Sequence, residues 1–445
     1  MVLARTVPQT RCCERERLSP RLHGHVILAT SSAAVHHRLL HDPYAPFRHR
    51  DYRLFIAMVL IASLAQQSMG VAVGWDIYER TGSAMALGWV GLAQFIPVLA
   101  FFLPAGQLAD RHDRRRIVAV SLVIWVAASA LLVVSAWRGL PVVWIYLAIA
   151  AIGMSTVLNR AGRDALLSQL VPADTLARGV MWNSTVFQTA SIAGPALAGL
   201  LIALGGSAIT VYAFNLAAML AAMTLALMIR KRPLSHDKRP STWADVFGGL
   251  AHVWKTKVVL GLITIDLFAV LLGGATALMP IYAKDILKVG PTGLGWLSAG
   301  PAIGAVMIAV LTARGWRRPP PHAGRAFLWA VGVFGVATIV FGLSRWYWLS
   351  FLALIVLGAA DNVGAVIRQT AVQLYTPDEL RGRVSAVNRV FISSSNELGA
   401  VESGLLASLT SPVFAVVAGG VATLVIASAG FRMFPALRQL KTVGK

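Results

Sequence analysis

Long apolar runs alternate with short polar segments along most of the chain. A membrane-spanning helix needs about 20 mostly apolar residues, so runs of that length bounded by charged residues or by Gly, Pro and Asn predict transmembrane helices. The predicted spans are Leu54–Tyr78, Ala84–Ala109, Ile117–Trp137, Pro141–Leu158, Val180–Leu204, Ala208–Ile229, Val258–Ala283, Gly293–Ala313, Ala326–Leu343, Trp348–Ile367, Val384–Leu409 and Val413–Phe434. The pattern therefore predicts an all-α integral membrane protein with twelve transmembrane helices.

Composition supports this class. Hydrophobic residues make up 57% of the 445 residues and charged residues 13%, with a mean hydropathy of +0.67. Soluble domains carry about 25% charged residues. The net charge of +21 does not indicate nucleic-acid binding, because the basic residues lie in short clusters between apolar runs rather than along one polar surface.

The basic residues predict the orientation in the membrane. Twelve spans place both termini on one face, and only five of the 40 Lys and Arg residues fall on the opposite face: Arg80, Arg138, Lys284, Lys288 and Arg345. Loops rich in Lys and Arg stay in the cytoplasm. We therefore expect cytoplasmic termini and a multi-pass protein of the plasma membrane, the inner membrane of a bacterium.

The two halves of the chain repeat each other. Residues 163–172 (RDALLSQLVP) match residues 368–377 (RQTAVQLYTP) at an offset of 205, and Gly199 matches Gly404 at the same offset. Two related six-helix halves in parallel orientation follow. Such pseudo-symmetric halves are typical of secondary transporters that expose a site near the middle of the membrane to each side in turn.

The remaining segments complete the predicted domain organisation. We expect a polar, Arg-rich and disordered leader (1–47), a first half (48–230), a cytoplasmic linker (231–257), a second half (258–435) and a basic cytoplasmic tail (436–445). A targeting peptide and an over-extended translation start are the alternatives for residues 1–41. Within the linker, apolar residues from Trp243 to Trp254 recur at helical spacing, which predicts an amphipathic helix on the membrane surface.

A loop between the second and third spans reads GQLADRHDRRR from Gly106 to Arg116. Gly106 permits close helix approach, and a carboxylate at a span end can bind an Arg or a helix N-terminus. The loop resembles the signature loop of the major facilitator superfamily, although Asp113 stands where that pattern has Gly. The resemblance implies a cytoplasmic gate made of Gly106, Asp110, Arg111 and Arg114; the alternative is that the arginines only set the topology.

The fifth span carries Gly194, Pro195 and Gly199. This spacing is similar to the Gly-Pro-x-x-x-Gly motif of proton-coupled exporters in the same superfamily, although close packing of small residues would also explain it. Residues 75–92 and 376–383, together with the gate loop, resemble the enterobactin-exporter-like branch. The resemblance covers about residues 43–435 and implies the major facilitator fold and a transport function.

Few acidic residues lie within the spans of the second half. They are Asp266, Asp361, Glu397 and Glu402. Ionisable groups in a membrane are costly and are usually retained for function. A carboxylate that binds a proton at one face and releases it at the other would couple transport to a proton gradient, so these four are candidate proton carriers. Hydrogen-bonded structural roles are the alternative.

These observations favour a secondary active transporter: a proton-coupled exporter of a small amphipathic molecule, siderophore-like or drug-like, that works by alternating access. An importer of the same fold and a non-transporting receptor or scaffold are the alternatives. No enzyme is expected, because the spans contain neither His nor Cys and the chain has no Walker-type loop. We expect no cofactor or metal, since the only cysteines, Cys12 and Cys13, lie in the leader. The expected partners are the substrate, protons and lipid, with no nucleic acid, and the expected state is a monomer.

Overall fold

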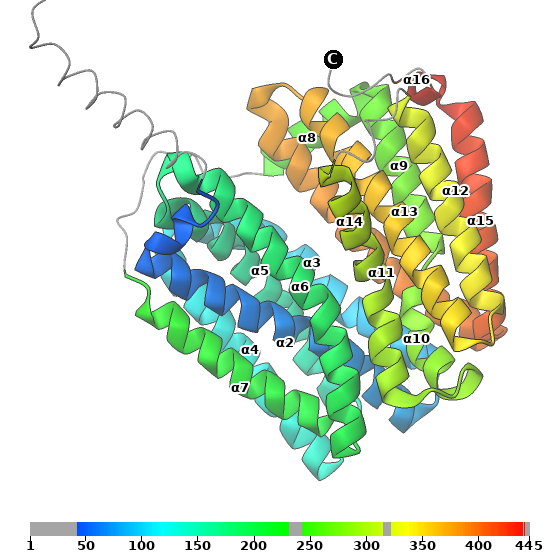
Figure 1. The fold of residues 1–445 in the computed structure, drawn as a ribbon, viewed down its shortest axis with the longest axis horizontal. Helices are drawn as coiled ribbons and strands as arrows, with labels where there is room; N and C mark the ends of the chain where they lie inside the picture. The colour runs from blue at the N-terminus through cyan, green and yellow to red at the C-terminus, as the bar shows by residue number, and fades with distance from the viewer. Residues whose placement is uncertain (1–41, 231–242, 315–321, 439, 441–445) are drawn as a thin grey trace, which may run out of the picture.

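The computed structural model describes residues 42–230, 243–314, 322–438 and 440, and every regular element in these ranges is helical (Figure 1). The elements are η2 (Ala45–Arg48), α2 (Arg50–Thr81), α3 (Ala84–Arg111), α4 (Arg114–Arg138), α5 (Val143–Leu170), α6 (Ala173–Gly205), α7 (Ile209–Met228), α8 (Trp243–Lys255), α9 (Lys257–Leu272), η3 (Ala275–Leu278), α10 (Met279–Ile281), η4 (Tyr282–Ile286), α11 (Gly290–Ala313), α12 (Ala323–Leu343), α13 (Tyr347–Leu374), α14 (Asp378–Leu409), α15 (Pro412–Met433) and α16 (Pro435–Arg438).

The helices confirm the predicted fold class, and one of them departs from the usual composition of a span. In the described ranges, 11 helical segments are long and apolar enough to cross a membrane. The eleventh predicted span, Val384–Leu409, lies in α14, which is 32 residues long but carries basic, acidic and hydroxyl side chains along most of its length. Polar groups at membrane depth need protein or water around them rather than lipid. Accordingly, Asn388, Ser395 and Ser403 of α14 are buried in the molecule.

The seventh span, predicted over residues 258–283, is found at Lys257–Ile286, but it is interrupted rather than one continuous helix. Helix α9 stops before Gly273 and Gly274, and the span continues as the short elements η3, α10 and η4. Two consecutive glycines weaken a helix. Helix α15 packs tightly at this point, because a β-carbon on Gly419 would lie only 2.1 Å from the carbonyl oxygen of Leu272. Interrupted helices are typical of transporters near their binding sites.

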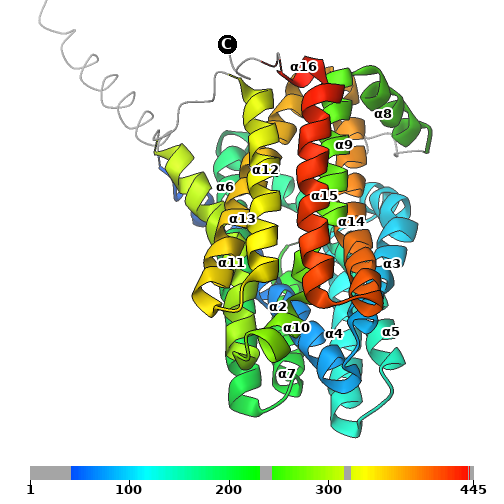
Figure 2. The same cartoon turned by 90° about the vertical axis from the view of Figure 1, so that its right-hand side faces the viewer.

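Packing between the helices repeats in the two halves (Figures 1 and 2). In the first half α2 packs on α6 and α7, α4 packs on α5 and α7, and α3 packs on α5. In the second half α9 packs on α14 and α15, α12 packs on α13 and α15, and α11 packs on α13. The halves meet through two equivalent pairs, α3 with α14 and α6 with α11. This arrangement is the pseudo-symmetry that the repeated segments predicted.

We call the face where α2 begins and α15 ends the terminal face, and the opposite one the distal face. At the terminal face, the last residues of the predicted leader pack on α6. Arg178 Nη1 donates to the carbonyl oxygen of Asp42 (2.7 Å), and Trp182 Nε1 donates to that of Pro43 (2.9 Å). Residues 1–41 lie outside the described residues.

Glycines bring the halves together near the distal face. A β-carbon on Gly199 of α6 would lie 3.0 Å from the Cα of Gly295 of α11. A β-carbon on Gly404 of α14 would lie 2.8 Å from the Cα of Gly88 of α3. Gly199 and Gly404 are the residues that match between the repeats, so the same close contact occurs at both interfaces. From these contacts the halves diverge toward the terminal face (Figure 1).

A group of side chains that we call the distal latch also joins the halves there. Tyr78 of α2 donates a hydrogen bond to the Asp285 carboxylate of η4. Lys284 Nζ lies 5.9 Å from the centre of the Trp75 ring and 5.8 Å from that of the Tyr78 ring. Distances of this size allow a cation–π attraction. The latch consists of Trp75, Tyr78, Lys284 and Asp285, and it must separate before the distal face can open.

Substitution of Gly404 by Ala should open the distal face, because the new β-carbon cannot fit against Gly88. Spin labels on cysteines at Trp137 and Trp346, exposed positions at the distal ends of the two halves, would report this as longer distances in pulsed electron resonance. Cys12 and Cys13 are replaced by Ser in this background. Gly70→Ala is the matched control, since a β-carbon at that position would have no atom of another described element within 4 Å. Equal distance distributions for both variants would refute the role of the glycine contact.

Substitution of Tyr78 by Phe should shift the same distance distribution toward the open form. A hydrogen bond to a charged group contributes about 1.5–3 kcal/mol, which corresponds to a population change of about tenfold or more. Tyr146→Phe is the control, because Tyr146 donates to the Ala86 carbonyl oxygen (2.9 Å) inside the first half. If Tyr78→Phe and Tyr146→Phe give the same populations of the open and closed forms, the latch does not determine the equilibrium between these two forms.

Candidate functional site

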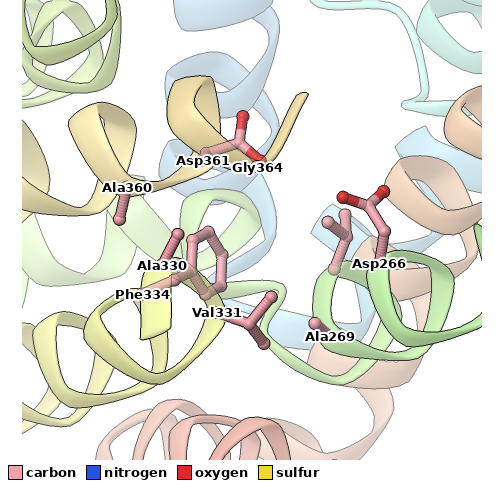
Figure 3. Close-up of a pocket in the computed structure, with 9 residues that line it drawn as sticks. Asp266, Ala269, Ala330, Val331, Phe334, Ala360, Asp361 and Gly364 are labelled. Atoms are coloured by element: carbon pink, nitrogen blue, oxygen red, sulfur yellow. The ribbon is translucent and has the colours of Figure 1, made fainter. Parts of the chain in front are cut away.

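A pocket inside the second half contains two of the four candidate acids. Its empty volume is about 270 Å³, and it lies between α9, α12 and α13. The lining residues are Asp266, Ala269, Val270, Ala330, Val331, Phe334, Ala360, Asp361 and Gly364. Figure 3 shows the two carboxylates on different sides of the pocket, with the Phe334 ring between helices that carry them. Apart from these two acids, the walls are apolar or small, so any charge that forms here has few partners.

Asp266 forms an ion pair with Arg368, which joins α9 to α13. Both residues are buried, with exposed fractions of 8% and 6%. The Nε of Arg368 has no hydrogen-bond acceptor among the described residues. Removal of one partner from a buried ion pair leaves an uncompensated charge, which costs about 3–5 kcal/mol. Each of these two buried charges is therefore stabilised by the opposite charge on the other side chain.

Arg368 was not predicted as a site residue. The predicted span ended at Ile367, which placed Arg368 outside the membrane, whereas α13 continues to Leu374. A signal was present in the sequence, because Arg368 matches Arg163 of α5 in the repeat. The Arg163 side chain also has a buried Nε without an acceptor in the described part of the chain.

Asp361 lies on the same face of α13 as Arg368, seven residues and thus two helical turns earlier. Unlike Asp266 it is exposed. The strongly exposed apolar residues of α13 lie on other sides of the helix; they are Trp348, Leu352, Val366 and Leu374. Asp361 therefore points away from the exposed apolar side of α13 and lines the pocket.

Glu397 and Glu402 do not line this pocket. Glu397 lies where α14 meets α3, and a β-carbon on Gly91 would lie 2.6 Å from its carbonyl oxygen. Glu402 accepts a hydrogen bond from Ser403 Oγ (3.3 Å), whose oxygen lies against Gly274 at the interruption of the seventh span. The structure thus brings Asp266 and Asp361 together and leaves the two glutamates on a separate helix.

Only part of the predicted gate can be described. Among the described residues, no atom of a neighbouring element lies within 4 Å of a β-carbon placed on Gly106, so none of them is a close neighbour across the halves in the present conformation. Arg114 Nη1 donates to the carbonyl oxygen of Ala165 (3.0 Å). Asp110 and Arg111 belong to α3, and their side chains lie outside the described residues.

Arg115 contacts the end of a helix. Its Nε donates to the Ala226 carbonyl oxygen (3.2 Å), and its Nη2 donates to that of Leu227, at the last turn of α7. A cation at a helix C-terminus binds the free carbonyl oxygens and the negative end of the helix dipole. The arginines of this loop therefore have local structural partners, in addition to any effect on topology.

The glycines of the fifth-span motif pack against the two main neighbours of α6, which are α2 and α11. A β-carbon on Gly194 would lie 2.6 Å from Gln67 Cβ, and Ser68 Oγ donates to the Gly194 carbonyl oxygen (2.9 Å). Gly199 lies against α11, one turn after Pro195, which is inside the helix. These three residues therefore join α2, within the same half, to α11 of the other half.

Stability measurements should detect the Asp266–Arg368 pair. Asp266→Asn and Arg368→Gln should each destabilise the protein by about 3–5 kcal/mol, because each leaves a buried charge alone. The double variant should lose less than the sum of the single losses. Asp361→Asn is the control, since the exposed carboxylate has no buried partner to abandon. Additive losses in thermal unfolding of the purified protein would show that the pair is not energetically coupled.

Similar sequences support a transport function. The chain is 29% identical over 411 residues to the multidrug efflux pump Tap of Mycobacterium tuberculosis, an alignment that covers 87% of this chain and 94% of that protein. It is 23% identical to macrolide efflux protein A of Streptococcus pyogenes, with 79% and 87% covered. It is 24% identical to the enterobactin exporter EntS of Shigella flexneri, with 85% and 90% covered.

Solved structures share the fold. A bacterial homologue of the lysosomal transporter Spinster, in an inward-facing and occupied conformation, superposes with a TM-score of 0.70 at 15% identity and covers 89% of this chain and 99% of that one. The nucleoside transporter NupG gives a TM-score of 0.67 at 14% identity, with 87% and 99% covered. At these identities the likeness concerns the fold alone.

The sequence profile of a family described as transmembrane secretion effector matches residues 41–443. The three relatives named above are efflux pumps and an exporter, and none is an enzyme. With long helices in two pseudo-symmetric halves and a profile match over nearly its whole length, the chain is a multi-pass membrane transporter that belongs to the transmembrane secretion effector family of the major facilitator superfamily.

Proposed function

We propose that this protein exports small amphipathic molecules, drug-like or siderophore-like, in exchange for protons. The observation that carries the proposal is the buried Asp266–Arg368 pair beside the exposed Asp361. The relatives, which are named for the efflux of several drugs, of macrolides or of enterobactin, supply the substrate classes. A monomer is sufficient for this function, since each chain contains both halves.

In this proposal the terminal face lies in the cytoplasm and the protein in the bacterial inner membrane. The distribution of Lys and Arg supports this orientation. The described conformation, closed by the glycine contacts and the latch at the distal face, is then inward-facing. Substrate enters between the halves from the cytoplasm, and the distal face opens to release it outside.

The ion pair supplies a coupling step. A proton that reaches Asp361 from the outer solution can pass to the neighbouring pocket and neutralise Asp266. Arg368 then becomes an unpaired buried cation, and this state is unfavourable by several kcal/mol. A shift of α13 relative to α9 that gives Arg368 a new environment lowers this energy. Protonation and movement of the second half are thereby linked.

The gate residues hold the opposite conformation in this proposal. When the distal face opens, the terminal ends of the halves come together, and Asp110, Arg111 and Arg114 then bind across the interface near Gly106. The glutamates Glu397 and Glu402 remain secondary candidates for proton transfer, because they lie outside the pocket that contains Asp266.

Flux measurements in everted membrane vesicles test the proposal. Vesicles energised by respiration acidify, and a pH-sensitive dye reports protons that leave when a transported compound is added. A macrolide, enterobactin and a panel of lipophilic compounds serve as probes. The parent should release protons with at least one compound, and Asp266→Asn and Asp361→Asn should abolish the release because neither can carry a proton.

Asp174→Asn is the matched control. Asp174 is an exposed carboxylate in the first turn of α6, away from the pocket, so this variant should keep the activity of the parent. Proton release that persists in both pocket variants, at normal protein levels, would contradict the assignment of the coupling site. Compound efflux without any proton release in the parent would contradict proton exchange itself.

A further inference from the structure

Helix α8 has two apolar faces, and only one of them is covered by the described part of the protein. On the covered face, a β-carbon on Gly249 would lie 2.9 Å from the carbonyl carbon of Arg383, at the start of α14. Val253 is 2% exposed and packs in a cluster with Val259 of α9 and Val384 of α14. This face attaches α8 firmly to the second half.

A polar contact adds to the attachment. The Nε2 of His252 lies 3.1 Å from the carbonyl oxygen of Tyr375, which follows α13. Helix α8 therefore contacts α9, α14 and the end of α13, and it must move with these helices when the halves rearrange.

The other face of α8 carries large exposed aromatic side chains. Phe247 is 63% exposed and Trp254 is 65% exposed. They are seven residues apart, so they lie on the same side of the helix, two turns from each other. Ala251, also exposed, lies between them. An exposed apolar stripe of this kind on a surface helix marks a contact with another protein surface or with a membrane.

The position of α8 along the chain indicates that the contact is with the membrane. Only Thr256 separates the end of α8 at Lys255 from the start of α9 at Lys257, and the seventh span begins with that lysine. Trp254 therefore lies at the level where a membrane-spanning segment begins, which is where interfacial Trp residues are enriched. Figure 2 shows α8 at the edge of the bundle, near the terminal face.

We propose that the exposed stripe of Phe247, Ala251 and Trp254 inserts into the headgroup region of the bilayer. Lys255 and Lys257, both exposed, then bind the phosphates of anionic phospholipids. Aromatic residues on one side and lysines at the end are the combination that holds a helix in a membrane surface. Through Gly249 and Arg383, this contact fixes the height of the terminal end of α14 relative to the bilayer.

Fluorescence quenching on the whole protein in lipid nanodiscs tests the insertion. In a background with Cys12 and Cys13 replaced by Ser, a bimane label on Ala251→Cys should be quenched by lipids with brominated acyl chains. Quenching should be several times stronger than for a label on Glu379→Cys, an exposed position at the start of α14. The substitution at Ala251 changes a small exposed side chain, so folding should be unaffected.

Two results would overturn the insertion. If iodide in solution quenches the label at position 251 as strongly as the label at position 379 and brominated lipid does not, the stripe faces water. If neither quencher acts at position 251, another part of the protein or a partner covers the stripe.

A second arm tests the headgroup contact. Phosphatidylglycerol added to phosphatidylcholine nanodiscs should increase the brominated-lipid quenching in the parent, and Lys255→Gln with Lys257→Gln should remove the increase. Arg138→Gln with Arg345→Gln, which removes the same charge at the distal face, should keep it. An increase that survives in the lysine variant would refute the phosphate contact.

Discussion

A charged side chain inside the low-dielectric membrane is tolerated only where an opposite charge or water surrounds it. Most features of this structure depend on that constraint. It explains why 11 of the described segments contain long apolar stretches and why α14, the polar one, packs against α3, α8, α9 and α15. It also explains the two states of the pocket acids. Asp266 is buried and bound to Arg368, whereas Asp361 is exposed.

The charged and polar groups at membrane depth are distributed unequally between the two halves. The halves have equivalent helix packing and equivalent glycine contacts, yet the pocket with its ion pair and the polar helix α14 both belong to the second half. The first half contributes the loop between α3 and α4, where Arg114 and Arg115 donate to backbone carbonyl oxygens of α5 and α7. In the proposed cycle, one half therefore responds to protons and the other supplies the surface on which it moves.

Most of the fold could be predicted from the sequence, because apolar length, basic loops and the repeat at an offset of 205 each act over many residues. The site was predicted less completely. Asp266 and Asp361 were found because any acid within a span is conspicuous. Arg368 was missed because an Arg near a predicted span end is usually a topology signal, whereas α13 continues to Leu374 and Arg368 is buried within it.

Other features depend on contacts between distant segments, which a single sequence does not reveal. The Gly273–Gly274 interruption needs the close approach of Gly419 from α15. The distal latch pairs Tyr78 with Asp285, 207 residues later. In the sequence each is an ordinary residue at the end of a span, and only the packing of the two halves gives them a common role.

The most direct test of the central claim is the protonation state of Asp266 in the two conformations. Infrared difference spectra between the parent and the distal-open Gly404→Ala protein would show it, with Asp266→Asn assigning the band. We predict an ionised Asp266 in the parent and a protonated carboxyl band in the distal-open form that disappears with Asp266→Asn. An Asp266 that stays ionised in both conformations would contradict the coupling of proton binding to alternating access.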